Sequence, residues 1–178
     1  MRFHTKLKRL FILILLCSLQ ANGQNAPEKK KLKPAEAVVR ELYKLVTFNA
    51  GQTPDWQLVK SLFIDDAVIV LRTSRTGHSV FSREAFVHDF QDFILRARVD
   101  TTGFTEAIIP IKTFETGDIA QSFVVYEASI PGRNRAPQRG LDEFHLIRQD
   151  STWRIVSIIN EIPTQARPLP EGFTKLFE

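Results

Sequence analysis

The last predicted hairpin of the chain carries two acidic residues, Asp142 and Glu161, that could perform acid–base chemistry. A two-residue turn at Asp150-Ser151 sets the hairpin register and places Asp142 opposite Ile159. Opposed residues and their i+2 neighbours share one face of a sheet, so the two carboxyl groups approach each other diagonally. Two carboxyl groups beside an apolar wall shift each other's pKa, which is how a general acid or base is tuned. Asp142 and Glu161 are therefore the predicted catalytic residues.

An alternative places both acids at the rim of a cavity rather than inside it. There they would be solvated or paired with Arg72, Arg139 or Lys112. Such ion pairs also perturb carboxyl groups without any catalytic role, so both interpretations stay open at this point.

The face of the hairpin that holds Asp142 is mainly apolar and predicts the wall of a binding pocket. We assign it to the concave, helix-covered side of a sheet because it is the more apolar face and carries the tryptophan. The opposite face is amphipathic and favours a homodimer contact through an open sheet surface. The predicted ligand-binding residues of the hairpin are Phe144, Trp153, Ser157 and Ile159.

Two further ligand-binding residues are predicted outside the hairpin, Tyr126 and Phe90. Tyr126 is followed by Glu127 on a long predicted strand, and because side chains alternate along a strand only one of them can face inward. The Tyr126 hydroxyl could donate a hydrogen bond to a ligand, or its ring could pack while the hydroxyl contacts water. Phe90 lies on the apolar face of a predicted helix over 82–98.

Motifs for other kinds of site are not found. The histidines lack the HxxxH or HxH spacing of a preformed metal site, and the single cysteine, Cys17, cannot form a CxxC site. A GxSxG nucleophile motif and a glycine-rich phosphate loop are also missing from the sequence. We therefore expect no structural metal and no nucleotide or other cofactor.

Three helices and a sheet must position these residues. Helices are predicted over 34–50, from the Thr53-Pro54-Asp55 start signal, and over 82–98 with Ser82 as its cap. The predicted strands cover 67–73, 104–114, 119–130, 141–149 and 152–162, with a polar loop over 74–81 and a bulge or edge at Pro110. This order predicts an α+β domain whose helices cover one face of a curved, mostly antiparallel sheet that forms a cone.

Local sequences within 35–163 resemble the nuclear transport factor 2-like superfamily, which includes ketosteroid isomerase and scytalone dehydratase. The matching segments are SLFIDDAVIV before the first strand, SREAF at the third helix, GDIAQSFVVYEAS in the long strand and RGLDEFHLIRQDSTWRIVSI in the last hairpin. The resemblance implies the cone fold. It also allows proton transfer by carboxylates inside the cone, as in those two enzymes.

The first 23 residues are typical of a secretory signal peptide. Arg2, Lys6, Lys8 and Arg9 precede an apolar run over 10–16, and small residues end the segment at Gly23. We expect cleavage there and export to the periplasm or the medium. An uncleaved N-terminal anchor and a lipid attached at Cys17 are the alternatives.

Removal of the signal peptide changes the charge of the chain. Four of its 24 lysine and arginine residues and none of its 20 acidic residues lie in 1–23, so the mature chain is neutral. A neutral chain does not favour nucleic-acid binding, and after signal removal no membrane association is expected. A polar, lysine-rich linker is predicted over 24–33, the domain over 34–163, and a proline-containing tail over 164–178.

Three classes of function are compatible with this sequence. The preferred one is an exported binding module with a largely apolar pocket for a small hydrophobic or amphipathic ligand. An isomerase- or dehydratase-type enzyme that uses a pocket carboxylate as general base is the second. A protein-interaction domain without a ligand is the third, because one fold can host all of them.

Overall fold

The computed structural model describes residues 34–178 except 75, 170–171 and 178. The predicted signal peptide over 1–23 and the predicted linker over 24–33 lie outside the described residues. The elements, in chain order, are α1 (Ala35–Val46), β1 (Phe48–Asn49), α2 (Trp56–Ser61), β2 (Phe63–Arg72), β3 (His78–Ser82), α3 (Arg83–Ala97), β4 (Gly103–Thr116), β5 (Ile119–Ser129), β6 (Gln138–Gln149), β7 (Thr152–Glu161) and the 3-10 turn η1 (Thr174–Phe177).

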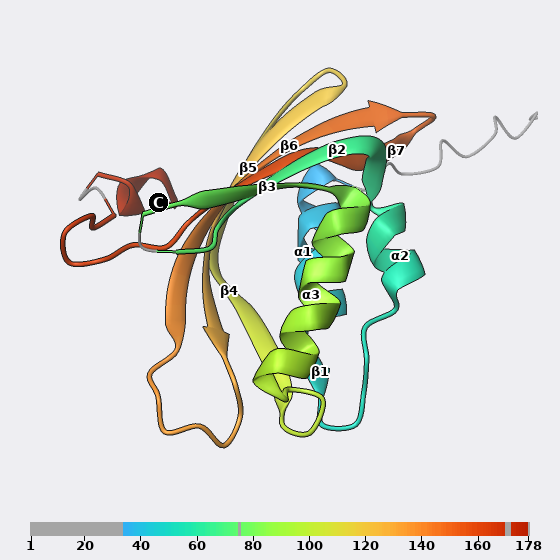
Figure 1. Cartoon of the computed structure of the whole chain (residues 1–178). Helices are drawn as coiled ribbons and strands as arrows, with labels where there is room; N and C mark the ends of the chain where they lie inside the picture. Colours follow the sequence, from blue (N-terminus) through green and yellow to red (C-terminus); the bar gives the residue numbers. More distant parts are fainter. Residues whose placement is uncertain (1–33, 75, 170–171, 178) are drawn as a thin grey trace, which may run out of the picture. The chain divides into compact units, whose positions relative to one another are not determined.

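The strands form one curled sheet in the order β1-β4-β5-β6-β7-β2-β3. All neighbouring strands are antiparallel except β2 and β7, which run parallel. Helices α1 and α3 lie on the same side of this sheet (Figure 1), and their apolar faces join the core that the sheet forms. The predicted α+β cone is confirmed. In the described part of the chain no helix is long and apolar enough to cross a membrane.

Helix α1 is joined to the sheet at its first residue. Pro34 precedes the helix and offers no side-chain cap, so the Ala35 amide donates instead to Glu115 Oε1 of β4 at 2.6 Å. An acidic side chain at a helix N-terminus satisfies a free N–H group and suits the helix dipole. The predicted helix over 34–50 ends earlier, at Val46, because Phe48 and Asn49 pair with β4 as strand β1.

Helix α3 has the bounds that its sequence signals indicate. The Ser82 side chain accepts from the Ala85 amide, and Arg98 ends the helix in the left-handed conformation with a φ of 54°. The loop predicted over 74–81 is wrong in its second half, since His78–Ser82 forms the edge strand β3. This strand alternates between exposed and half-buried residues, so it lacks the apolar alternation that marks a strand in sequence.

The last hairpin follows the predicted register only near its turn. Asp150 and Ser151 both have positive φ, as a two-residue hairpin turn requires, and Leu146 faces Ile155 as predicted. Between the pair Leu146–Ile155 and the next pair, His145–Ser157, β7 contains an extra residue, Val156, which forms a β-bulge. Beyond it the register shifts by one residue.

The bulge reverses the faces of the distal half of β7. Asp142 pairs with Asn160 rather than Ile159, and Phe144 pairs with Ile158 rather than Ser157. The predicted helix-covered position of Phe144, Leu146, Trp153 and Ile155 is confirmed, because all four are buried in the core. The predicted pairing of Asp142 with Ile159, and with it the diagonal approach of Glu161, is wrong, since a one-residue slip turns every later side chain to the other face.

Two neighbouring isoleucines test this register. Ile158 is 4% exposed and Ile159 is 45% exposed, whereas the uninterrupted register predicts the reverse. Ile158→Ala should lower the free energy of unfolding by about 2–5 kcal/mol because it empties part of the core. Ile159→Ala should change it by less than about 1 kcal/mol, as at most exposed positions. Urea denaturation of both variants measures this, and a larger loss for Ile159→Ala would contradict the bulged register.

Candidate functional site

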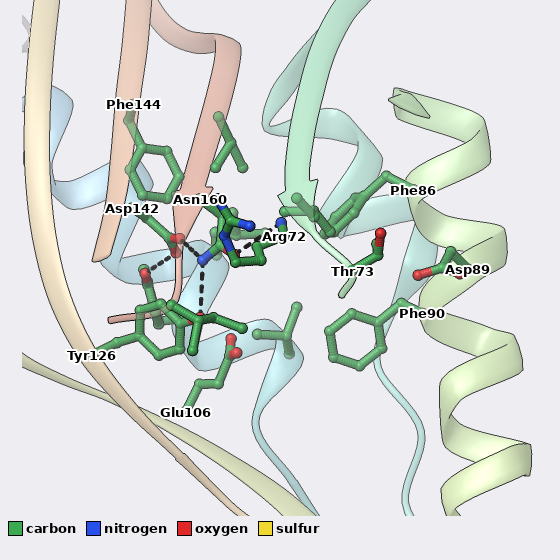
Figure 2. Close-up of a pocket in the computed structure, with 16 residues that line it drawn as sticks. Arg72, Thr73, Phe86, Asp89, Phe90, Glu106, Tyr126, Asp142, Phe144 and Asn160 are labelled. Carbon is green, nitrogen blue, oxygen red and sulfur yellow. Dashed lines mark hydrogen bonds between the residues drawn. The ribbon is translucent and has the colours of Figure 1, made fainter. Parts of the chain in front are cut away.

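A cavity of about 250 Å³ lies under the helices on the concave side of the sheet. We call it the central cavity. Its walls come from α1, α3 and five strands, and Figure 2 shows Glu106, Tyr126, Asp142 and Asn160 opposite the two phenylalanines of α3. Apolar side chains make up half of the lining: Leu42, Val46, Leu71, Phe86, Phe90, Phe144, Ile158 and Ile162. The polar members are Tyr43, Arg72, Thr73, Asp89, Glu106, Tyr126, Asp142 and Asn160.

Asn160 organises the polar side of the cavity. Its amide nitrogen donates to Asp142 Oδ1 at 2.7 Å and to the Tyr126 hydroxyl at 3.0 Å. Its amide oxygen accepts from the backbone N–H of Arg72 at 3.3 Å. Both ends of the amide are therefore used, which fixes its orientation. We refer to Tyr43, Tyr126, Asp142 and Asn160 as the Asn160 cluster.

Helix α1 contributes the fourth member of the cluster. The Tyr43 hydroxyl donates to Asp142 Oδ2 at 2.5 Å, so this carboxyl accepts one hydrogen bond on each oxygen. The Tyr43 ring packs 5.9 Å from the Tyr126 ring and 6.2 Å from the Phe144 ring. The helix–sheet packing that buries Tyr43 thus also delivers its hydroxyl to the acid.

A second carboxyl, that of Glu106 on β4, points toward the space beside the Asn160 cluster (Figure 2). The side chain has no hydrogen-bond or ion-pair partner among residues 34–178 that the structure describes. Its backbone is held by Thr47, whose hydroxyl oxygen accepts from the Glu106 N–H at 3.0 Å. The site therefore contains two carboxyl groups in different settings, one that accepts a hydrogen bond on each oxygen and one that is open to the cavity.

The two carboxyl groups have raised pKa values. Burial raises the pKa of Asp142 from 3.8 to about 6, although the hydrogen bonds from Tyr43 and Asn160 oppose the rise. Burial and the nearby Asp142 charge raise the pKa of Glu106 from 4.5 to about 8. Both residues keep some accessible surface because they line the cavity. That surface does not restore the hydration that an exposed carboxylate has, so removal from water is the dominant cause.

Two tyrosines remain protonated beside these acids. Burial and the Asp142 charge raise the pKa of Tyr43 well above 10, and the same causes raise the pKa of Tyr126. The Tyr126 hydroxyl accepts from Asn160 and keeps its own proton to donate. Its position depends on Gly140, its direct neighbour on β6, because a Cβ atom there would lie 2.2 Å from the Tyr126 ring. A strand glycine often marks such a close approach.

The eight predicted site residues lie in three different places. Asp142, Tyr126, Phe90 and Phe144 line the central cavity, whereas Trp153 is buried in the core beside it. The three others are on the outer side of β7. Ser157 contacts His145 Nδ1 at 3.0 Å, and Ile159 is exposed.

Glu161 forms the ion pair that the rim alternative describes. Its Oε2 accepts from Arg72 Nη2 at 2.6 Å, and this pair lowers the pKa of Glu161. His78 and Arg167 lie at 3.8 and 3.9 Å from the same carboxylate. Glu161 is therefore not the second carboxyl group beside Asp142 in the cavity. That group belongs to Glu106.

Sequence reasoning missed three residues that form the polar side of the cavity, Tyr43, Glu106 and Asn160. A signal exists for the first two, since Tyr43 follows the buried Val39 by one helical turn and Glu106 alternates with Phe104 and Ile108 on β4. Asn160 had no such signal because its inward position depends on the bulge. Across the described residues no group of three histidine, cysteine or acidic side chains could hold a metal ion.

No family model matches the sequence, and no curated protein is similar to it. Solved structures share its arrangement. An NTF2-like protein with a cystatin-like fold from Novosphingobium aromaticivorans is 14% identical, covers 80% of this chain and 85% of its own, and superposes with a TM-score of 0.59. The chain has the nuclear transport factor 2-like fold.

Two further neighbours carry enzyme names. A protein from Shewanella frigidimarina, provisionally named a ketosteroid isomerase, is 18% identical over 71% of this chain and 94% of its own, with a TM-score of 0.52. One from the same Novosphingobium species, provisionally named a scytalone dehydratase, is 12% identical over 72% and 81%, with a TM-score of 0.54. The resemblance of the sequence to the NTF2-like superfamily is confirmed at the level of the fold, and one fold hosts many activities.

The raised pKa of Glu106 predicts how stability depends on pH. The folded protein holds the Glu106 proton up to about pH 8, while the unfolded chain releases it near 4.5. The folded state therefore binds more protons in this window, and stability falls as pH rises through it. Glu106→Gln should flatten this fall. The free energy of unfolding of the variant, relative to that of the wild type, should therefore be higher at pH 9 than at pH 5.

Urea denaturation at both pH values measures the difference. Glu127→Gln is the matched control, because Glu127 lies on the neighbouring strand, faces outward and pairs with Arg139 at 2.6 Å. An equal pH dependence in the wild type and Glu106→Gln would contradict the burial of an ionisable Glu106.

Proposed function

We propose that this domain binds a small, partly hydrophobic molecule in the central cavity. The observation that supports the proposal is a cavity of about 250 Å³ with a fixed polar group at one side, the Asn160 cluster. Half of the residues that line this cavity, but most of its accessible lining surface, are apolar. Small-molecule sites are concave and mostly apolar, with a few placed polar groups that orient the ligand. The central cavity has this composition.

The uncommitted polar atoms favour a ligand over a purely structural role. Asn160 uses all of its hydrogen-bonding groups within the protein, whereas the Glu106 carboxyl has no partner in the described chain. A desolvated polar group without a partner is destabilising, and proteins retain such groups mainly at functional sites. A bound molecule would supply the missing partner.

An enzyme that transfers protons is the second candidate. It is favoured by two carboxyl groups in one cavity whose pKa values are raised to about 6 and about 8, close to the range in which general acids and bases operate. In this form Asp142 would act as base while Glu106 or Tyr126 donates a hydrogen bond. Lost turnover with retained ligand binding in Asp142→Asn would favour the enzyme over the binding module.

The setting of the protein is proposed from its sequence and its outer surface. We propose export after cleavage at Gly23, and a homodimer through the outer face of the sheet, where Phe114 and Ile119 are 49% and 62% exposed. N-terminal sequencing of the exported protein should begin at Gln24. Sedimentation of the mature protein should show a dimer at micromolar concentration, and a pure monomer would contradict the interface.

A matched pair of tryptophan variants tests binding in the central cavity. Leu71 lines the cavity, whereas Leu95 on α3 is 69% exposed and does not. Leu71→Trp should fill space that a ligand needs and weaken binding by about 10-fold or more, which corresponds to at least about 1.4 kcal/mol. Leu95→Trp should bind as the wild type does.

The probe is 2-phenylethanol, a neutral molecule small enough for the cavity, and saturation-transfer difference NMR measures its affinity. Circular dichroism spectra of both variants control for folding. Equal affinity in the two variants, or no binding to the wild type, would contradict the proposal.

A further inference from the structure

We propose that the central cavity selects a protonated amine, that is, a small molecule with an ammonium group attached to an apolar body. This inference rests on the proposed function of the cavity as a binding site and specifies the class of ligand. It follows from the distribution of charges around the cavity, from the hydrogen bonds already formed inside it, and from the unpartnered carboxyl of Glu106.

Acidic side chains face the cavity from three elements. Asp89 comes from α3, Glu106 from β4 and Asp142 from β6. Asp89 pairs with Arg96, with Oδ1 and Nη2 3.7 Å apart, and that arginine side chain is 65% exposed. Hydration screens an exposed pair of this kind strongly, so it offsets little of the negative potential inside the cavity.

One cationic side chain, that of Arg72, also lines the cavity. It pairs with Glu161, with Nη2 and Oε2 2.6 Å apart, so its charge is matched by an acid that is not part of the lining. The charges that remain unmatched in the cavity are therefore negative. In a poorly hydrated space such charges attract a cation and repel an anion more strongly than they would in water.

The hydrogen bonds of the Asn160 cluster also favour a ligand with an ammonium group. Asn160 and Tyr43 already donate to Asp142, so their protons are not available to a ligand. What the cluster and Glu106 offer to a ligand is mainly carboxylate oxygens, with the Tyr126 proton as one donor. An ammonium group has three donors and no acceptor, which complements this set better than a carbonyl or a carboxylate does.

Aromatic rings complete the match. The rings of Phe86 and Phe90 lie 6.3 Å apart on the α3 wall, and Phe90 also packs 5.6 Å from Trp56. Figure 2 places Phe86 and Phe90 across the cavity from Glu106 and Asp142. An apolar body would rest on these rings while the ammonium group reaches the acids, and ring faces themselves attract cations.

Binding should also depend on pH. The titratable and charged groups that face the cavity are Tyr43, Arg72, Asp89, Glu106, Tyr126 and Asp142. Of these, the Asp142 carboxyl has a pKa of about 6 and the Glu106 carboxyl a pKa of about 8, whereas the two tyrosines stay protonated between pH 6 and pH 8. Amine affinity should therefore rise as pH increases from 6 to 8, because an ionised carboxylate binds ammonium better than a neutral acid does.

The experiment compares three probes of nearly equal shape: 2-phenylethylamine, 2-phenylethanol and phenylacetate. Isothermal titration calorimetry with the mature wild-type protein at pH 8 should rank the amine first, at least about 10-fold tighter than the alcohol, with phenylacetate weakest. Glu106→Gln should weaken binding of the amine much more than binding of the alcohol, and so remove most of the preference for the amine. Glu127→Gln, on the outer face, should leave all three affinities unchanged.

Asp89→Asn supplies a second variant, because Asp89 lies on the partly exposed side of α3 and its replacement should not impair folding. It should weaken the amine selectively, by less than Glu106→Gln does. If the alcohol or the carboxylate binds as tightly as the amine, the inference is wrong while the proposed binding function stands. If none of the three probes binds, both fail.

Discussion

The β-bulge at Val156 determines which side chains of β7 reach the interior. Without the extra residue, Ser157, Ile159 and Glu161 would face the helices. With it, Ile158 enters the core and Asn160 meets Asp142. Bulges of this kind redirect side chains and are common next to functional sites. β7 therefore contributes Ile158 and Asn160 to the central cavity because one of its residues, Val156, has no pairing partner on β6.

The cost of placing polar groups in this interior is offset locally. Asp142 accepts hydrogen bonds from Tyr43 and Asn160, and the Arg72 backbone fixes the Asn160 amide. A buried polar network is stabilising only when its members are satisfied, and these four groups satisfy one another. Glu106 is the exception. Its carboxyl is removed from water without a partner in the described chain, which raises its pKa and makes it the group most open to a ligand.

The sequence allowed much of the fold to be predicted because strong local signals set it. Ser82 caps α3, Asp150-Ser151 forms the two-residue turn, and of the bulge or edge expected at Pro110 it is a bulge that is present, between Ile108 and Ile111. These signals are local: a side-chain cap, a turn that needs positive φ, and a proline that cannot donate to a ladder.

The site was predictable only in part because its geometry depends on a bulge that lacks such a marker. Val156 lies in a run of β-branched and apolar residues with no glycine or proline, so alternation gave the wrong face for Asn160 and for Glu161. Asp142 and Tyr126 were predicted correctly because they lie on β6 and β5, whose alternation the bulge in β7 does not change. The Asp142–Tyr43 contact joins residues 99 positions apart, and only the packing of α1 on the sheet brings them together.

The central claim is that two carboxyl groups, those of Asp142 and Glu106, share a poorly hydrated cavity. A pH titration followed by ¹³C NMR of the side-chain carboxyl carbons tests it directly, with Asp142→Asn and Glu106→Gln used for assignment. The account predicts that the Asp142 carboxyl titrates near pH 6 and the Glu106 carboxyl near pH 8. Titration of both groups near their ordinary values of about 4 would contradict it.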